Sequence, residues 1–266
     1  MVSELFIVRW PQNISAVYVR GATIRYSKNQ SVYYANEVLS PGQVICTWNS
    51  ESDYVLSGSA PSLPLLQVGR HYELSFKLKA DNDLPVQIQI KFLDTQKEII
   101  NSYSSTETCF NFEVPKGTVS YEINLINLKH RWLLFDFLSI SESGEEKIIE
   151  KHFRKHYDWV HVKQAKLPQN KAAHLIVNRG PRSIVPVSLK QNIDYEQIFV
   201  YTDGKNIEKL ITDLDTAFQV HNDYELTIEA GIEFYSIPKE IIKKIEMSLI
   251  SKKITRRQTK NDQLDY

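Results

Sequence analysis

The segment VQIQIKF, residues 86–92, decides the fold because its apolar and polar residues alternate without interruption. In an extended chain its four apolar side chains fall on one face, and the two glutamines and the lysine fall on the other. This period of two predicts a β-strand with one face on a hydrophobic core. The segment YELSFKL at 72–78 has the same pattern.

Similar short segments, rich in β-branched and aromatic residues, recur between residues 5 and 140 with turn residues between them. This rhythm predicts an antiparallel β-sandwich or jelly roll. The order of strands and turns resembles that of carbohydrate-binding modules of the jelly-roll type. The fold class expected is therefore mainly β, with a smaller α/β region after the sandwich.

The length of 266 residues favours one large domain or two modest ones. The polar segment SESGEEK at 141–147 is the best boundary, because hydrophobic alternation ends there. We expect a sandwich over residues 1–142, a small α/β region over 143–251 and a flexible polar tail over 252–266.

Charge and apolar content restrict the partners and the location of the chain. Lys plus Arg number 32 and Asp plus Glu number 32, so no net field would attract nucleic acid or an anionic membrane. No apolar segment approaches the roughly 20 residues that a membrane span requires, and the first residues lack the pattern of a signal peptide. We expect a cytoplasmic protein. Cys46 and Cys109 have no metal-ligand spacing, so no metal or cofactor is predicted.

The second half begins with a segment that has helical spacing. Ile149, Phe153, Tyr157 and Val160 recur at intervals of three or four, which predicts a helix. Its two histidines at 152 and 156 could hold a metal on one helix face, but the glutamate of an HExxH motif is absent, so an ordinary polar face is the simpler interpretation.

A β-to-α unit follows. IFVYT at 198–202 reads as a buried strand, a helix carries an apolar stripe over 207–218, and a further strand and a helix after Pro238 complete the region. Asp203 stands where α/β folds place chemistry, but Asp203-Gly204 is more simply a turn and cap. Since phosphate loops and nucleophile elbows are missing, we predict no catalytic residue and no enzyme activity.

The candidate binding residues lie mainly in the irregular segment SPGQVICTWNSESDYVLSGSAPSLPLL at 40–66. Trp48 could stack on a flat ligand while Asn49 and Tyr54 bond its edge. Arg131 and Trp132 have the same chemistry. The alternative for Trp48 is a place in the core.

Several separated motifs also identify a family. RWPQ at 9–12, VYVRGATIRY at 17–26, YANEVLSPGQVICTWNS at 34–50, PSLPLLQVGRHYELSF at 61–76 and KFLDTQKEII at 91–100 together resemble the third accessory secretory protein family of the accessory Sec system. Leu39 and Cys46 depart from the family's pattern, so no role is carried over to them. The resemblance covers the first half of the chain.

The resemblance implies a non-catalytic subunit in the export of serine-rich repeat adhesins. Its implied partners are two sibling accessory secretory proteins, the accessory SecA motor and the adhesin preprotein, and these partners could bring it to the inner face of the membrane. An exposed sheet edge or loop, assigned to Trp48, Asn49 and Tyr54, would hold the preprotein. One alternative is a stand-alone module that binds N-acetylglucosamine-type glycans, and another is an enzyme built on the α/β half around Asp203.

Overall fold

The computed structural model describes residues 2–52, 60–81, 85–142, 148–163, 172–190, 195–219, 225–231 and 238–249. The polar tail expected over 252–266 lies outside these ranges. The chain divides into two units. The first comprises Met1–Glu145 and Ser183–Gln191, and the second comprises Glu146–Arg182 and Asn192–Tyr266.

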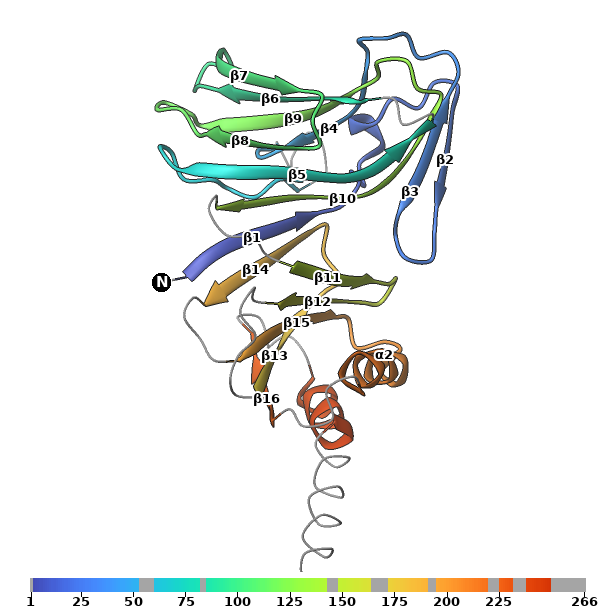
Figure 1. The fold of residues 1–266 in the computed structure, drawn as a ribbon, viewed down its shortest axis with the longest axis vertical. Helices are drawn as coiled ribbons and strands as arrows, with labels where there is room; N and C mark the ends of the chain where they lie inside the picture. Colours follow the sequence, from blue (N-terminus) through green and yellow to red (C-terminus); the bar gives the residue numbers. More distant parts are fainter. Residues whose placement is uncertain are drawn as a thin grey trace, which may run out of the picture. The chain divides into compact units, whose positions relative to one another are not determined.

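Two sheets build the first unit (Figure 1). The seven-stranded sheet has the order β14-β1-β10-β3-β2, with β5 also paired to β10 and β8 paired to β5. Its strands are β1 (Val2–Val8), β2 (Ala22–Tyr26), β3 (Val32–Asn36), β5 (His71–Ala80), β8 (Cys109–Glu113), β10 (Trp132–Glu142) and β14 (Ile184–Lys190). The four-stranded sheet has the order β4-β9-β6-β7 and comprises β4 (Val44–Asn49), β6 (Gln87–Leu93), β7 (Ile99–Ser105) and β9 (Ser120–Ile126). The 3-10 turn η1 (Ile14–Ala16) precedes β2.

The core of the first unit lies between the two sheets. Ile88, Ile90 and Phe92 of β6 are fully buried, while the glutamines and the lysine between them are only partly covered. They share one hydrophobic cluster with residues of the seven-stranded sheet, such as Leu74 and Phe135. The antiparallel β-sandwich expected from period-two alternation is confirmed.

Strand β14 belongs to the first unit although it lies beyond residue 180 in the sequence. It pairs antiparallel with β1 along its whole length, from Val2↔Lys190 to Val8↔Ile184. The bounds expected from the sequence placed this segment in the α/β region over 143–251. The local sequence pattern of a strand does not specify its pairing partner, so only the tertiary structure shows to which sheet the strand belongs.

In its described residues, the second unit is a mixed sheet with two helices. The sheet has the order β11-β12-β15-β13-β16, in which β13 is parallel to both β15 and β16. Apolar residues of α2 (Ile207–Gln219) and of the helix at 239–249 form its core with the sheet. The strands are β11 (Ile148–Phe153), β12 (Tyr157–Lys163), β13 (Ala172–Arg179), β15 (Glu196–Thr202) and β16 (Glu225–Ala230). The predicted β-to-α unit is confirmed.

The helix expected from Ile149 to Val160 is wrong. These residues form the antiparallel hairpin β11–β12, which turns where Arg154 N–H donates to Tyr157 O over 2.9 Å. β-Branched and aromatic residues favour strands, and the pairing of β12 with β15 extends the sheet. The helical spacing of four apolar residues was coincidental.

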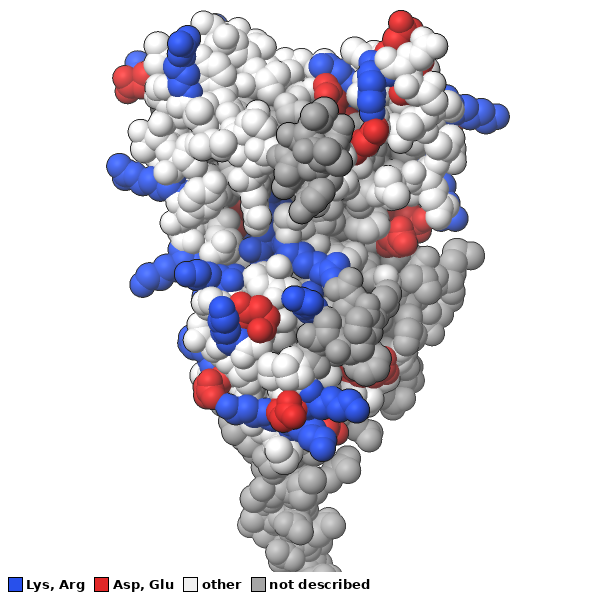
Figure 2. All heavy atoms as spheres, turned by 180° about the vertical axis from the view of Figure 1, so that it is seen from behind, with Lys and Arg blue, Asp and Glu red and all other residues white. Residues whose placement is uncertain are grey.

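None of the helices in the described ranges is long and apolar enough to cross a membrane. On the face drawn in Figure 2, basic and acidic side chains are interspersed, in line with their equal totals in the sequence.

Candidate functional site

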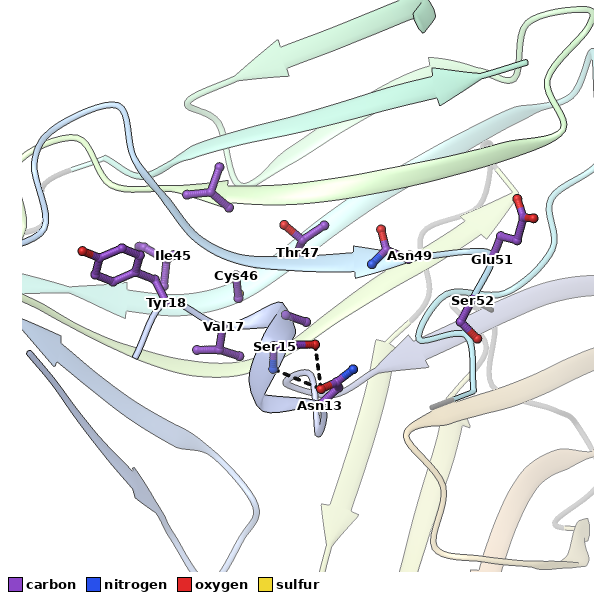
Figure 3. A pocket seen from close by; sticks show the side chains of 12 residues that line it. Asn13, Ser15, Val17, Tyr18, Ile45, Cys46, Thr47, Asn49, Glu51 and Ser52 are labelled. Carbon is purple, nitrogen blue, oxygen red and sulfur yellow. Dashed lines mark hydrogen bonds between the residues drawn. The ribbon is translucent and has the colours of Figure 1, made fainter. Parts of the chain in front are cut away.

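A groove of about 480 Å³ lies along the outer edge of β4, between that strand and the segment that contains η1 (Figure 3). Its lining is uncharged except for one glutamate and consists of small polar and aliphatic residues with one tyrosine: Asn13, Ser15, Ala16, Val17, Tyr18, Val44, Ile45, Cys46, Thr47, Asn49, Glu51 and Ser52. An uncharged, partly polar ligand therefore matches its chemistry.

The main chain of β4 is covered at both ends of the groove and less so between them. Tyr18 N–H donates to Ile45 O over 2.8 Å, and Asn49 O accepts from the N–H groups of Ser62 and Leu63 at 2.9 and 3.0 Å. Because alternate residues of a strand turn their peptide groups to the same side, the carbonyl of Thr47 faces the groove, while the antiparallel bridge between Val17 and Cys46 covers its N–H.

Two ionisable groups of the lining are held in fixed states. The side-chain hydrogen bond from Lys97 keeps the pKa of the Glu51 carboxyl below its usual range, so the groove's one carboxylate is ionised and paired. Burial raises the pKa of the Cys46 thiol well above its usual range, so this side chain is an uncharged part of the lining. The groove thus offers no unpaired charge within its described lining.

Polar side chains continue from the groove across the outer face of the four-stranded sheet. Thr47 Oγ1 donates to Asn124 Oδ1 over 2.7 Å, and Asn124 Nδ2 donates to Glu122 Oε1 over 3.0 Å. Lys91 Nζ lies 2.9 Å from the same Glu122 oxygen. Sequence reasoning missed Thr47 and Asn124 as site residues, although the polar alternation of SYEINLI at 120–126 is a signal that one face of this strand is polar.

Trp48 is a core residue, which corrects its assignment to an exposed stacking surface. Its side chain is fully buried, and its ring contacts those of Trp10, Phe76 and Phe135 at centroid distances of 6.2, 5.8 and 5.5 Å. Its Nε1–H donates to Arg9 O over 2.7 Å. The alternation that turns the half-buried Thr47 and Asn49 outward turns Trp48 inward, so Trp48 cannot stack on a ligand.

The other predicted site residues do not form one cluster. Asn49 lines the groove, and Tyr54 lies outside the described residues. Trp132 begins β10 in the other sheet, where it is half-buried and stacks on Tyr33 at 6.0 Å. Arg131 is exposed, and its N–H donates to Asp81 Oδ1 over 2.9 Å. Neither Arg131 nor Trp132 lines the groove.

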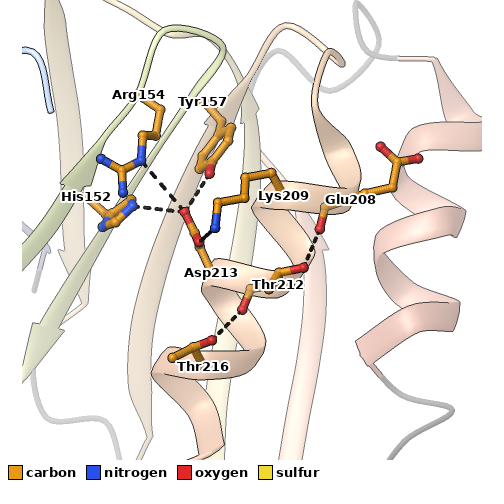
Figure 4. Close-up of polar contacts among 8 residues, drawn as sticks. All are labelled: His152, Arg154, Tyr157, Glu208, Lys209, Thr212, Asp213 and Thr216. Atoms are coloured by element: carbon orange, nitrogen blue, oxygen red, sulfur yellow. Dashed lines mark hydrogen bonds and ion pairs between the residues drawn. The ribbon is translucent and has the colours of Figure 1, made fainter. Parts of the chain in front are cut away.

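In the second unit, a group of polar side chains joins the hairpin β11–β12 to α2 (Figure 4). Tyr157 donates to Asp213 Oδ2 over 2.6 Å, and Lys209 Nζ lies 2.9 Å from Oδ1. His152 Nε2 is 2.9 Å from Oδ2, and Arg154 Nε is 3.8 Å from it. Burial, with a smaller effect from Arg154, lowers the pKa of His152. The arrangement fixes the helix on the sheet.

His152 and His156 do not share a helix face, since one lies on β11 and the other in the turn. His156 Nδ1 is 3.0 Å from Asp203 Oδ2, and Asp203 Oδ1 accepts from Lys205 N–H over 2.8 Å. Asp203 therefore caps the turn before α2. Within the described ranges, no three His, Cys, Asp or Glu residues are grouped to hold a metal.

Residues 17–142, all within the first unit, match a family described as Accessory Sec secretory system ASP3. An accessory Sec system protein of this name, ASP3, from Streptococcus gordonii is 29% identical over 129 residues, which cover 48% of this chain and 81% of that protein. The ASP3 protein of Staphylococcus aureus (strain NCTC 8325 / PS 47) is 25% identical over 148 residues, 56% of this chain and 46% of that protein. The chain thus spans less than half of the second relative.

Two solved structures contain similar chains. A crystal structure of accessory secretory proteins 1, 2 and 3 of Streptococcus pneumoniae matches 52% of this chain and 95% of that chain at 27% identity and a TM-score of 0.49. A chain of the Glycosylation Associate Protein (Gap123) complex of Streptococcus agalactiae matches 100% of this chain and 89% of its own, at 17% identity and a TM-score of 0.50. At that identity the second match concerns the fold alone.

Proposed function

Residues 17–142 place this chain in the accessory Sec secretory system ASP3 family, and from that premise we propose that it is a non-catalytic subunit that binds the exported preprotein. A role in accessory secretion follows from the family. The finer statement is supported by the groove at β4, whose small, uncharged and partly polar lining is suited to an uncharged polar segment of a preprotein.

The proposed partners are two sibling accessory secretory proteins, the accessory SecA motor and a serine-rich repeat adhesin preprotein. The sibling partners are carried over from the Streptococcus pneumoniae relative, which was solved together with accessory secretory proteins 1 and 2 and is 27% identical to this chain. The motor and the adhesin come from the family's role in export. In this proposal the protein acts in the cytoplasm and reaches the membrane through its partners.

Binding of a serine-rich segment in the groove would use hydrogen bonds rather than charge. Thr47 offers its carbonyl, and Asn49 offers an amide that donates and accepts. Since a serine hydroxyl also donates and accepts, it can bond either group. Charged segments would be disfavoured, because the lining's one carboxylate is already paired with Lys97.

The test places a charge in the groove. Asn49→Lys would leave the main-chain bonds of residue 49 intact and put an ammonium group into a groove whose described lining has no unpaired carboxylate. We expect preprotein recovery with the tagged protein to fall about tenfold, equivalent to about 1.4 kcal/mol, while sibling recovery stays unchanged. Asn111→Lys, at an exposed position on β8, is the matched control. Equal preprotein recovery with both variants would refute the groove's role.

A stand-alone module for N-acetylglucosamine-type glycans is the alternative, favoured by the Thr47 hydroxyl and the Asn49 amide that line the groove. The glycan-binding alternative relied on Trp48 as its main stacking residue, and Trp48 is buried. Titration of the purified chain with free N-acetylglucosamine separates the two functions, because the export subunit should bind no free sugar.

A further inference from the structure

Strand β7 is an open edge of the sandwich. It is the last strand of the four-stranded sheet, and among the described strands it pairs with β6 alone (Figure 1). Ile99, Ile100, Asn101, Ser102 and Ser104 are all exposed. The opposite edge of the same sheet, β4, is instead partly covered by its own chain at residues 17–18 and 62–63.

The composition of β7 differs from that of the other edge strands. Natural proteins protect exposed edges with charged residues, with proline or with a covering segment. Each of the other outermost strands in the described sheets has such a residue or cover: Arg25 on β2, residues 17–18 over β4, Glu113 on β8, Lys151 on β11, Pro186 on β14 and Glu229 on β16. β7 reads IINSYSS and contains neither charge nor proline.

The peptide groups that β7 directs outward can be identified. Ser102 N–H donates to Asn101 Oδ1 over 2.7 Å, so it points away from β6. Alternation places the peptide groups of Ser104 on the same side. Within the described part of the chain, the bond to the Asn101 side chain is the one partner found for these groups, and replacement of Asn101 would remove it.

We propose that β7 is a docking edge at which an extended, uncharged, serine-rich segment of another polypeptide adds as a further strand. Main-chain hydrogen bonds would supply the affinity of such strand addition. The chemistry of the edge selects the occupant, because β7 has no charged residue with which a charged segment could pair, whereas its serine and asparagine side chains can donate to and accept from serine hydroxyls. This inference rests on the proposed function, which assigns a serine-rich preprotein to this protein, and adds a second contact on the same sheet.

The experiment uses the full chain and a fluorescein-labelled synthetic peptide of alternating serine and threonine residues without charge. Binding is followed by fluorescence anisotropy. Ser104→Pro removes an outward N–H but no bond to β6, whereas Ser104→Ala keeps that N–H. Both variants lose the same side-chain contact, in which Gln89 Nε2 donates to Ser104 Oγ over 3.4 Å. A peptide N-methylated at alternate residues is the second probe, and it requires no change in the protein.

We expect Ser104→Pro to weaken peptide binding at least about fivefold, the effect of one net hydrogen bond, and Ser104→Ala to bind like the original chain. Asn101→Ala should bind more tightly, because it uncaps the Ser102 N–H, and the N-methylated peptide should not bind. A purely structural role for Asn101 would give no such gain.

Equal binding of the methylated and unmethylated peptides, or no binding of either, would overturn the proposal. Sedimentation velocity of the chain alone tests a second occupant. A dimer that Ser104→Pro abolishes would show that β7 pairs with another copy of this chain, and that result would also overturn the assigned occupant. Sibling recovery from the host reports on the export function separately, so failure at β7 and failure of the proposed function can be distinguished.

Discussion

Replacement of Trp48 by alanine should strongly destabilise the first unit without acting directly on ligand binding. The side chain is fully buried against Trp10, Phe76 and Phe135. Truncation of a buried tryptophan costs about 3 to 5 kcal/mol, and loss of the bond to Arg9 O adds about 1 kcal/mol. We therefore expect a loss of about 4 to 6 kcal/mol, a large fraction of the roughly 5 to 15 kcal/mol that stabilises a domain.

Trp48→Phe is the matched control, because it keeps an aromatic ring in the core and removes the hydrogen bond. Its cost should be well below that of Trp48→Ala, because the lost bond to Arg9 O costs the same about 1 kcal/mol and most of the ring packing is kept. The assay is hydrogen exchange under increasing urea, which follows peptides of the two units separately. A tryptophan fluorescence signal would be altered by the substitution itself.

The expected result is earlier exchange in β4, β6 and β9 of Trp48→Ala, with little change in β13 and β15 of the second unit. Two observations would contradict the reasoning. One is a loss below about 1 kcal/mol, which is far less than removal of a buried aromatic side chain costs. The other is a folded Trp48→Ala protein that has lost preprotein binding while Trp48→Phe retains it, which would return Trp48 to a ligand-contacting role.

Three further predictions concern other parts of the chain. Gly21→Ala should lower the melting temperature more than Gly42→Ala. Both glycines have positive φ, but only at Gly21 would an added Cβ lie 2.6 Å from Val38 Cγ2. Equal shifts in melting temperature would contradict the prediction. Burial acts to raise the pKa of Asp213, but its bonds with Tyr157 and Lys209 outweigh burial and lower it. The stability that ionised Asp213 contributes is therefore present above its unfolded pKa and lost as pH falls through the lower folded pKa. Asp213→Asn should destabilise the protein at neutral pH, and the difference in stability from the original chain should shrink in acid. A melting-temperature series from pH 7 to pH 3 checks this prediction, and a difference that stays constant would count against it. Iodoacetamide should modify exposed Cys109 in the native protein and buried Cys46 only after unfolding, as peptide mass spectrometry would show, and rapid native labelling of Cys46 would contradict its burial.

The β-strands of the first unit were predictable because each carries its own signal. Ile88, Ile90 and Phe92 alternate with polar residues, and that pattern requires one buried and one outer face whatever the partner strand is. The buried strand β15 and the apolar stripe of α2 were predictable for the same reason.

The hairpin β11–β12 shows where local signals fail. Four apolar residues at helical spacing predicted one helix, whereas pairing with β15 and the strand preference of aromatic and β-branched residues produced two strands. Only part of the candidate site was predictable. Asn49 was found from its chemistry, but the groove exists because η1 lies against β4, a contact between segments that are about thirty residues apart in the sequence.

Local pattern thus accounts for the fold class, the balance of charge and the motifs of the family, because these depend on residue type and spacing along the chain. Packing and pairing decided the rest. Whether Trp48 faces a ligand or the core depends on which side of β4 the second sheet covers, and whether 184–190 joins the first or second unit depends on the free edge of β1. Edge exposure is likewise a property of the assembled sheets. Strand β7 can be identified as an open edge only by comparison with the other edge strands of the described sheets, each of which has a charged residue, a proline or a covering segment.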